Sequence, residues 1–134
     1  MSKLYFVDSN IWLYAAITGN EKSESARVLI ESKSIVISTQ VINEVSFNLL
    51  RKYRYSEDEV ETFIREISIS CHVHLLTIQT CLVASTIRQR YQLSFWDSMI
   101  VAAALESQCV ILYSEDMQHN QRIEGKLTIC NPFS

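Results

Sequence analysis

Short apolar runs alternate along the chain with longer stretches in which apolar residues recur every three or four positions. The short runs are rich in Val, Ile and Tyr and predict β-strands, whereas the longer stretches predict α-helices. The predicted strands cover residues 3–7, 35–37, 72–77 and 109–113, and a short fifth strand covers 127–130. The predicted helices cover residues 10–17, 21–32, 39–53, 56–70, 79–91 and 95–107. This alternation indicates βα units rather than a helical bundle or a β-sandwich.

Strands that are each followed by a helix require right-handed crossovers, which join parallel strands. We therefore expect an α/β protein of three layers, with helices on both faces of a central parallel sheet of four to five strands. The chain has 134 residues, of which 48% are hydrophobic, with 2 Gly and 1 Pro. This composition suits one closed core and leaves little material for a linker. We expect a single domain over residues 1–131 and a tail at 132–134.

Four carboxylates fall at the boundaries of these predicted elements. Asp8 directly follows the first strand, and Asp116 comes three residues after the fourth. Glu44 lies in the second turn of the helix after the second strand, and Asp97 lies in the first turn of an almost wholly apolar helix. Because ligands of parallel α/β sheets bind beyond the carboxyl ends of the strands, we expect the four acids to share one site.

Each of these acids also has a structural explanation. Asp8 could cap the helix that follows it, and Asp97 fits a capping box with Ser94. Asp116 lies in a polar turn, where aspartate is common. Glu44 is harder to explain, because it borders the apolar face of its helix, where a carboxylate needs a partner. Capping does not exclude a role in a site, and four acids at one end of a sheet favour a common purpose.

The chemistry expected of such a site is metal-assisted hydrolysis. Two carboxylates about 4 Å apart repel by roughly 4 kcal/mol at an effective dielectric constant near 20, so clustered acids need protons or cations. Hard oxygen ligands without a cysteine or histidine cluster favour Mg²⁺ or Mn²⁺ over zinc. Such an ion can activate water against a phosphodiester. Ser9, Asn10 and Ser114 are near enough in the sequence to orient the carboxylates or to hold metal-bound water.

A basic run interleaved with tyrosines follows Glu44 on the same predicted helix: Arg51-Lys52-Tyr53-Arg54-Tyr55. The three basic side chains could bind RNA phosphates while the tyrosines stack on bases. The other interpretation is an ordinary helix C-terminus, where cations interact favourably with the helix dipole.

The net charge, the cysteines, the histidines and the apolar stretches add further expectations. The net charge of −3 excludes a protein coated in positive charge, so any contact with nucleic acid must be local. The four cysteines show no CxxC spacing and are expected to be small core residues in a reducing compartment. His72 and His74 lack further metal ligands and are expected at exposed or core-edge positions. No apolar stretch suits a signal peptide or a membrane span, so we expect a cytoplasmic protein without a membrane partner.

Four short motifs in this order resemble those of the PIN-domain nucleases, in particular the VapC toxins of toxin–antitoxin pairs. The motifs are Phe-Val-Asp-Ser-Asn-Ile-Trp around Asp8, Asn-Glu-Val around Glu44, Trp-Asp-Ser-Met-Ile-Val-Ala-Ala-Ala around Asp97, and Leu-Tyr-Ser-Glu-Asp-Met around Asp116. The resemblance covers nearly the whole chain. It implies a PIN-like fold, a metal-dependent endoribonuclease that cuts structured RNA such as tRNA, a homodimer, and an antitoxin partner.

The resemblance also assigns roles to residues. It carries over Asp8, Glu44 and Asp97 as metal ligands, with Asn10 and Ser114 as polar support. The match at Asp116 is weaker, because many family members have another acid two positions later, followed by an aromatic residue. This chain has Gln118 and His119 there, which leaves open whether one metal ion is bound or two.

Two alternatives to the endoribonuclease remain open from the sequence. Gln118 motivates a catalytically degenerate PIN module that binds RNA or protein without cutting. An aspartate after the first strand also occurs in phosphoryl-transfer enzymes, in which Asp8 would become phosphorylated. That chemistry usually requires a second nearby acid, and position 10 is Asn.

Overall fold

The computed structural model describes residues 2–134. Its strands are β1 (Tyr5–Val7), β2 (Ile35–Ser38), β3 (His72–His74), β4 (Ile111–Tyr113), β5 (Arg122–Ile123) and β6 (Leu127–Cys130). Its helices are α1 (Ser9–Ala16), α2 (Ser23–Glu31), α3 (Thr39–Arg51), α4 (Glu57–Ser70), α5 (Ile78–Arg90) and α6 (Phe95–Glu106). Every predicted helix and strand is present, and β5 is the element that the sequence pattern did not predict.

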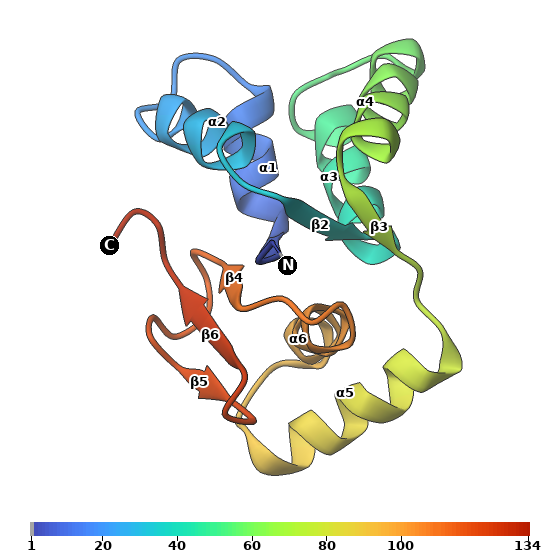
Figure 1. Ribbon diagram of the computed structural model, residues 1–134. Helices are drawn as coiled ribbons and strands as arrows, with labels where there is room; N and C mark the ends of the chain where they lie inside the picture. The colour runs from blue at the N-terminus through green and yellow to red at the C-terminus, as the bar shows by residue number, and fades with distance from the viewer. Residues whose placement is uncertain (1) are drawn as a thin grey trace.

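The strands of residues 2–134 form one sheet in the order β3-β2-β1-β4-β6-β5. All neighbouring strands are parallel except β5 and β6, which form an antiparallel hairpin at the edge. α1 and α2 lie on one face of the sheet, and α5 and α6 lie on the other (Figure 1). The α/β fold with a mainly parallel central sheet is therefore confirmed, with one strand more than expected.

The core lies where the central strands meet α6. Phe6, Val7 and Leu112 are fully buried, as expected for strands covered on both faces. On α6, the run from Ser98 to Ala104 is buried throughout. The alanines of this run have short side chains, which let the helix lie close to the sheet. This packing fixes the first turn of α6, and with it Asp97, relative to the ends of β1 and β4.

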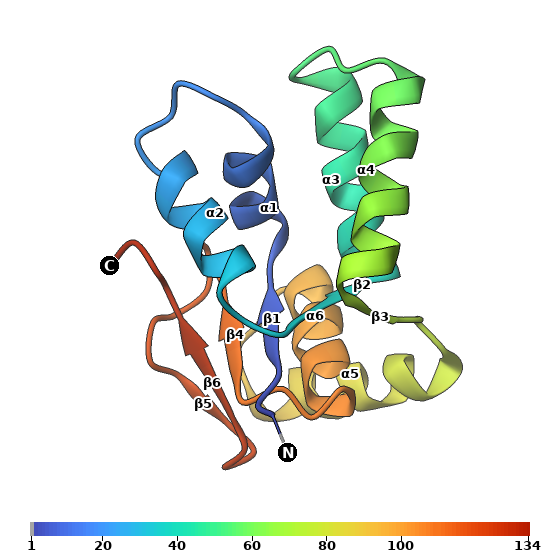
Figure 2. The ribbon, with the colours of Figure 1, turned by 45° about the horizontal axis from the view of Figure 1, so that its top comes forward.

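α3 and α4 form a hairpin that projects beyond the carboxyl end of β2 (Figure 2). α3 begins directly after β2, where the Ser38 hydroxyl caps the helix by accepting the amide of Val41 at 3.3 Å. α4 begins with a complete capping box formed by Ser56 and Glu59. Because α3 starts at the end of a central strand, its second turn lies at the same end of the sheet as Asp8.

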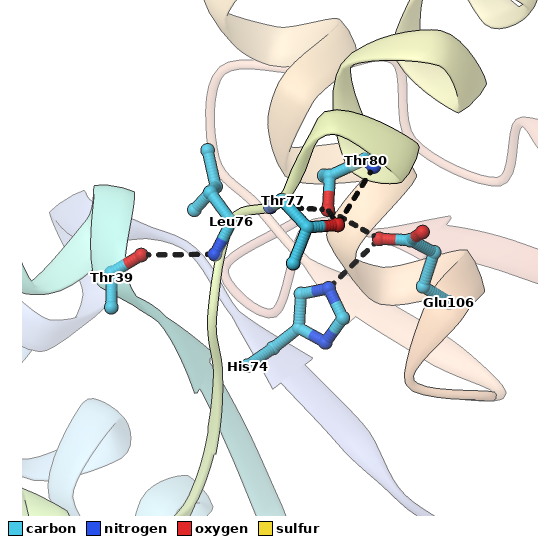
Figure 3. Close-up of polar contacts among 6 residues, drawn as sticks. All are labelled: Thr39, His74, Leu76, Thr77, Thr80 and Glu106. Carbon is cyan, nitrogen blue, oxygen red and sulfur yellow. Dashed lines mark hydrogen bonds and ion pairs between the residues drawn. The ribbon is translucent and has the colours of Figure 1, made fainter.

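A polar cluster joins β3, α5 and α6 (Figure 3). Glu106 Oε1 lies 2.8 Å from His74 Nε2 and accepts the Thr80 hydroxyl at 2.6 Å. We call these three residues the Glu106 cluster. The strand predicted over residues 72–77 ends at His74, because the Leu76 amide donates to the Thr39 hydroxyl and Thr77 caps α5. As predicted, His74 lies at the core edge.

Three smaller expectations can be compared with the structure. Cys109 is buried, and Cys71 and Cys130 are half-buried, but Cys81 is exposed on α5 and is not a core residue. The residues expected to form a tail lie against α1, where the Phe133 ring packs edge-on at 5.5 Å from the Tyr14 ring. Within residues 2–134, no helix is long and apolar enough to cross a bilayer.

Candidate active site

The four predicted acids line one cavity of about 250 Å³ at the carboxyl end of the sheet. They reach it from four separate parts of the chain: the end of β1, the second turn of α3, the first turn of α6 and the loop after β4. We call this hollow the acid cavity. Its lining residues are Asp8, Ser9, Asn10, Glu44, Asn48, Asp97, Ile100 and Asp116.

Asp8 is the most deeply buried of the four acids, with 6% of its surface exposed. It caps α1, because its Oδ1 accepts the Ser9 amide at 2.7 Å, and its Oδ2 accepts the Ser114 hydroxyl at 2.9 Å. Burial raises the pKa of Asp8 to about 6, although these two hydrogen bonds oppose the shift. The charges of Glu44 and Asp97 contribute to the same increase in the pKa. Asp8 therefore both caps α1 and lines the acid cavity.

The partners of Glu44 are neutral groups. Its Oε1 accepts the Ser9 hydroxyl at 2.5 Å, and its Oε2 accepts the Gln40 amide at 3.3 Å. The Asn48 amide donates to the backbone carbonyl of Glu44 at 2.9 Å. A carboxylate beside an apolar helix face was expected to need a partner. Glu44 has hydrogen-bond donors as partners, but none of them carries a compensating positive charge.

Asp97 lies in the first turn of α6, where the Ser94 hydroxyl accepts its amide at 3.1 Å. Burial raises the pKa of Asp97, and the charges of Asp116 and Glu44 raise it further, against a lowering contribution from Ser94. The pKa values of Asp8 and Asp97 are thus each raised in part by other acids of the cavity, as expected for carboxylates that repel one another. Repulsion of this kind is what a bound cation would relieve.

Asp116 and Glu115 are neighbours in the sequence but have different surroundings. Asp116 enters the acid cavity, where its Oδ2 accepts the Asn10 amide at 2.6 Å. Glu115 accepts the Tyr14 hydroxyl at 2.6 Å and pairs with the Lys22 ammonium. Its partial burial opposes ionisation, but Lys22 and Tyr14 lower the pKa of Glu115 overall. Glu115 is therefore engaged elsewhere and does not take the place of a fifth acid in the cavity.

The acid cavity fits a hard divalent cation by the chemistry of its donors. Carboxylate, hydroxyl and amide oxygens are the ligands preferred by Mg²⁺ and Mn²⁺. Among residues 2–134, the ion pairs involve other acids, so no lysine or arginine offsets the four charges. As the side chains are placed in this structure, no three acidic, histidine or cysteine side chains of residues 2–134 lie close enough together to bind one metal ion.

The basic run lies at the far end of α3 and in the turn that follows. Arg51 is seven residues beyond Glu44, which is two helical turns and about 10 Å along the axis, on the same side of the helix. Its guanidinium lies 5.6 Å from the Phe47 ring. Lys52 and Arg54 are exposed. The Tyr55 hydroxyl, in contrast, donates to the carbonyl of Ala16 at 2.8 Å, which ties this tyrosine to α1 and disfavours its stacking on a base.

Sequence reasoning missed two polar residues of the site. Gln40 and Asn48 lie four positions before and after Glu44 and therefore share its side of α3. Gln40 donates to the Glu44 carboxylate, and Asn48 lines the acid cavity. Counting helical turns in both directions from Glu44 would have found both.

A sequence model of the PIN domain matches residues 5–123. The chain belongs to the PIN-domain family. The family assignment made from the four motifs is thus confirmed. Comparison with curated protein sequences finds no match.

Solved structures of VapC-type proteins share the fold. VapC20 of Mycobacterium tuberculosis, described as a sarcin–ricin loop cleaving toxin, is similar with a TM-score of 0.70 and 22% identity, over 84% of this chain and 89% of that chain. A toxin–antitoxin complex from Klebsiella pneumoniae gives a TM-score of 0.70 and 21% identity, over 98% of both chains. The DNA-bound VapBC of Salmonella typhimurium gives 0.68 and 16%, over 96% of this chain and 97% of that chain. At these identities the likeness shows a common PIN fold.

Proposed function

We propose that this PIN-domain protein is a Mg²⁺- or Mn²⁺-dependent endoribonuclease and the toxin of a toxin–antitoxin pair. The observation that carries the proposal is the acid cavity, which four carboxylates from distant parts of the chain line together and whose lining includes no positively charged side chain. A fold gains no stability from such repulsion, so the arrangement is best explained by a bound cation. Phosphodiester hydrolysis is the reaction for which such an oxygen-lined site is suited.

Within this proposal, Asp8, Glu44, Asp97 and Asp116 are the residues that would hold the metal. When bound, Mg²⁺ or Mn²⁺ supplies charge that attracts the scissile phosphate and lowers the pKa of an attacking water. The chain's own polar groups hold the carboxylates in place. Ser114 fixes Asp8, and Ser9 and Asn10 orient Glu44 and Asp116, respectively.

Contacts to the RNA backbone are proposed along α3. Arg51 lies two turns from Glu44 on the same side of the helix, and Asn48 lies between them. A phosphate next to the scissile one would be within reach of this side of α3. Lys52 and Arg54 lie close by, at the tip of the hairpin, and can contact a more distant part of a folded RNA.

The substrate and partners are proposed from the relatives. VapC20 is named as a toxin that cleaves the sarcin–ricin loop, and other similar structures are toxin–antitoxin complexes. We propose a structured RNA as substrate, with a ribosomal loop or tRNA as the classes to test first. We also propose a cognate antitoxin as partner, a homodimeric state and a cytoplasmic location.

The test is cleavage by the purified chain of total RNA with Mg²⁺, with Mn²⁺ and with EDTA. Cleavage should require the metal, and Asp8→Asn should reduce it about 10³-fold or more, because loss of several kcal/mol of transition-state stabilisation has that effect. Glu115→Gln is the matched control, since it removes the charge of an acid outside the cavity. Undiminished cleavage by a folded Asp8→Asn protein would rule out the assigned mechanism.

A PIN module that binds without cutting is the second candidate. Gln118 in place of an acid and the spread of the four carboxylates in the described arrangement favour it. Induced expression in bacteria of wild type beside Asp8→Asn separates the two candidates, with growth and RNA integrity scored together. An enzyme harms RNA only as wild type, whereas a binding module leaves RNA intact in both. Phosphorylated Asp8 trapped from the wild type would instead indicate the phosphoryl-transfer alternative.

A further inference from the structure

A second hollow lies directly beside the acid cavity. It has a volume of about 530 Å³ and is lined by Thr39, Gln40, Asn43, Glu44, Leu76 and Trp96. We call it the indole groove. Glu44 lines both hollows, so anything that occupies the indole groove lies next to whatever the four acids bind.

Trp96 forms an exposed aromatic wall of this groove. A tryptophan at the start of an almost wholly apolar helix would be expected in the core or an interface, but 62% of the surface of Trp96 is exposed, so it is not a core residue. It directly precedes Asp97 in the first turn of α6. The Phe95 ring packs edge-on against the indole, with centroids 5.0 Å apart and planes at 80°. An exposed tryptophan held by a second aromatic ring is a pre-oriented surface for stacking.

A hydrogen-bonded link fixes the indole groove to the acid cavity. The Gln40 amide donates to Glu44 Oε2 at 3.3 Å and to the backbone carbonyl of Trp96 at 3.2 Å. One side chain therefore joins the start of α3 to the start of α6 across the groove. This link fixes the Trp96 backbone relative to Glu44.

The lining of the groove indicates the chemistry of its occupant. Trp96 and Leu76 supply apolar surface, whereas Asn43 and Thr39 supply amide and hydroxyl groups. The only charged residue of the lining is Glu44, and no lysine or arginine is present. A phosphate or an acidic peptide would meet a negative wall here. A flat, uncharged ring with hydrogen-bonding edges matches both the apolar and the polar parts.

We propose that the indole groove binds a nucleobase of the RNA substrate, adjacent to the phosphodiester that is cleaved, with the base stacked on Trp96. This inference rests on the proposed nuclease function and assigns Trp96 as a substrate-binding residue. The base lies in the groove while its neighbouring phosphate lies at the four acids. The groove thus positions the scissile bond and favours sites at which that base is unpaired.

The test measures binding of a 12-nucleotide single-stranded RNA of mixed sequence, together with a series in which each base in turn is removed to leave an abasic ribose. The protein carries Asp8→Asn so that the RNA stays intact. Removal of the stacked base should weaken binding about tenfold, as expected for one aromatic–base contact. In the Trp96→Ala version every RNA of the series should bind equally weakly, and Trp96→Phe should restore most of the discrimination.

Tryptophan fluorescence provides a second readout. The chain has 2 Trp, and Trp12 is buried with its indole N–H bonded to the carbonyl of Val7 at 3.0 Å. Quenching on addition of RNA should therefore come from Trp96 and vanish in Trp96→Ala. Ile69→Ala is the control for loss of an exposed apolar side chain, because Ile69 is 87% exposed on α4 and lies outside the groove.

The outcomes separate this inference from the function on which it rests. If wild type cuts RNA but Trp96→Ala binds and discriminates the abasic series as well as the Trp96 protein does, the inference is wrong and the nuclease stands. If Trp96→Ala retains RNA binding but loses a purified antitoxin, the groove serves a protein partner and the inference is again wrong. If wild type neither binds nor cuts RNA in Mg²⁺ or Mn²⁺, both proposals fail.

Discussion

The acid cavity and the Glu106 cluster both place carboxylates at junctions between strands and helices, but the groups that contact these carboxylates differ. In the Glu106 cluster, one carboxylate meets a histidine and a threonine hydroxyl from two other elements. In the acid cavity, Asp8, Glu44 and Asp116 accept hydrogen bonds from hydroxyl and amide groups, and the charges of neighbouring acids contribute to the raised pKa values of Asp8 and Asp97. The first arrangement joins parts of the fold, whereas the second costs stability that the proposed cation would restore.

This difference separates structural from functional charge within one domain. A carboxylate with a matched partner explains its own burial, and its replacement should weaken the fold and leave the chemistry unchanged. A carboxylate whose pKa is raised by burial and by other acids has no such explanation. Replacement of such a group should therefore affect activity and stability in opposite directions.

The largest expected difference between the two regions is in RNA cleavage. Glu44→Gln removes a charge from the acid cavity and should lower cleavage about 10³-fold, since Glu44 is a proposed metal ligand and such a ligand supplies several kcal/mol. Glu106→Gln removes a charge from the Glu106 cluster and should leave cleavage at 25 °C within about twofold. Single-turnover rates at saturating RNA measure both. Equal losses in the two variants would show that the acid cavity has no special role.

Asp8→Asn should lower RNA cleavage but raise the stability of the fold. The raised pKa of about 6 means that between pH 3.8 and 6 the folded chain binds more protons than the unfolded chain. The free energy of unfolding therefore falls as the pH rises through this interval. Without metal, Asp8→Asn removes that fall and should stabilise the protein by up to about 3 kcal/mol above pH 6, since one pKa unit corresponds to about 1.4 kcal/mol.

Urea unfolding of both proteins in EDTA at pH 4 and pH 7.5 measures this effect. The stability difference should be large at pH 7.5 and close to zero at pH 4, where the wild-type aspartate is also protonated for most of the time. Glu61→Gln, at an exposed residue of α4 paired with Arg65, is the control and should show little difference at either pH. A destabilised Asp8→Asn protein at pH 7.5 would contradict the account of the acid cavity.

A loss of stability is expected when the Glu106 cluster is broken. Thr80 is fully buried, and its hydroxyl donates to Glu106 and accepts the Thr77 amide. Thr80→Val preserves the shape of the side chain and removes these bonds, so it should destabilise the protein by about 2 kcal/mol. Ser85→Ala, on the same helix, is the comparison. Thermal or urea unfolding detects the loss, and unchanged stability would mean that the cluster contributes little to the fold.

The smallest expected effect is stabilisation by the metal. Mg²⁺ at ten times its dissociation constant should stabilise wild type by about 1.4 kcal/mol, because only the folded chain brings the four acids together. The shift in Tm should be clearly smaller for Asp8→Asn and unaffected in Glu106→Gln. Equal shifts in wild type and Asp8→Asn would place the ion outside the acid cavity.

The sequence predicted most of the fold because its pattern is local. Apolar runs and polar helix starts such as Ser56 specify where helices begin, and the alternation of strands and helices specifies parallel pairing. β5 was not predicted, because it is two residues long and forms only by pairing with β6. Its turn depends on the positive φ angles of Glu124 and Gly125, and a glutamate in that conformation is not a recognisable turn signal.

The acids of the site were predictable for the same reason, since strand ends converge in a parallel sheet. The difference between Glu115 and Asp116 was not. It depends on Lys22 and Tyr14, which lie far away in the sequence and draw Glu115 toward α1. The exposure of Trp96 was equally unpredictable, because an indole beside an apolar helix resembles a core residue until the packing is known.

The burial of Asp8 has a consequence for the abundance of the protein in a cell. A gain of about 3 kcal/mol lowers the unfolded fraction by roughly 10², and proteases act largely on unfolded chains. An Asp8→Asn copy, which the proposed mechanism makes inactive, would therefore outlast the wild-type protein when no metal is bound. Such a copy keeps the rest of its surface, so it would still bind any partner that recognises the fold. A mixture of wild-type and Asp8→Asn chains would therefore bind more of that partner than the activity of the mixture suggests.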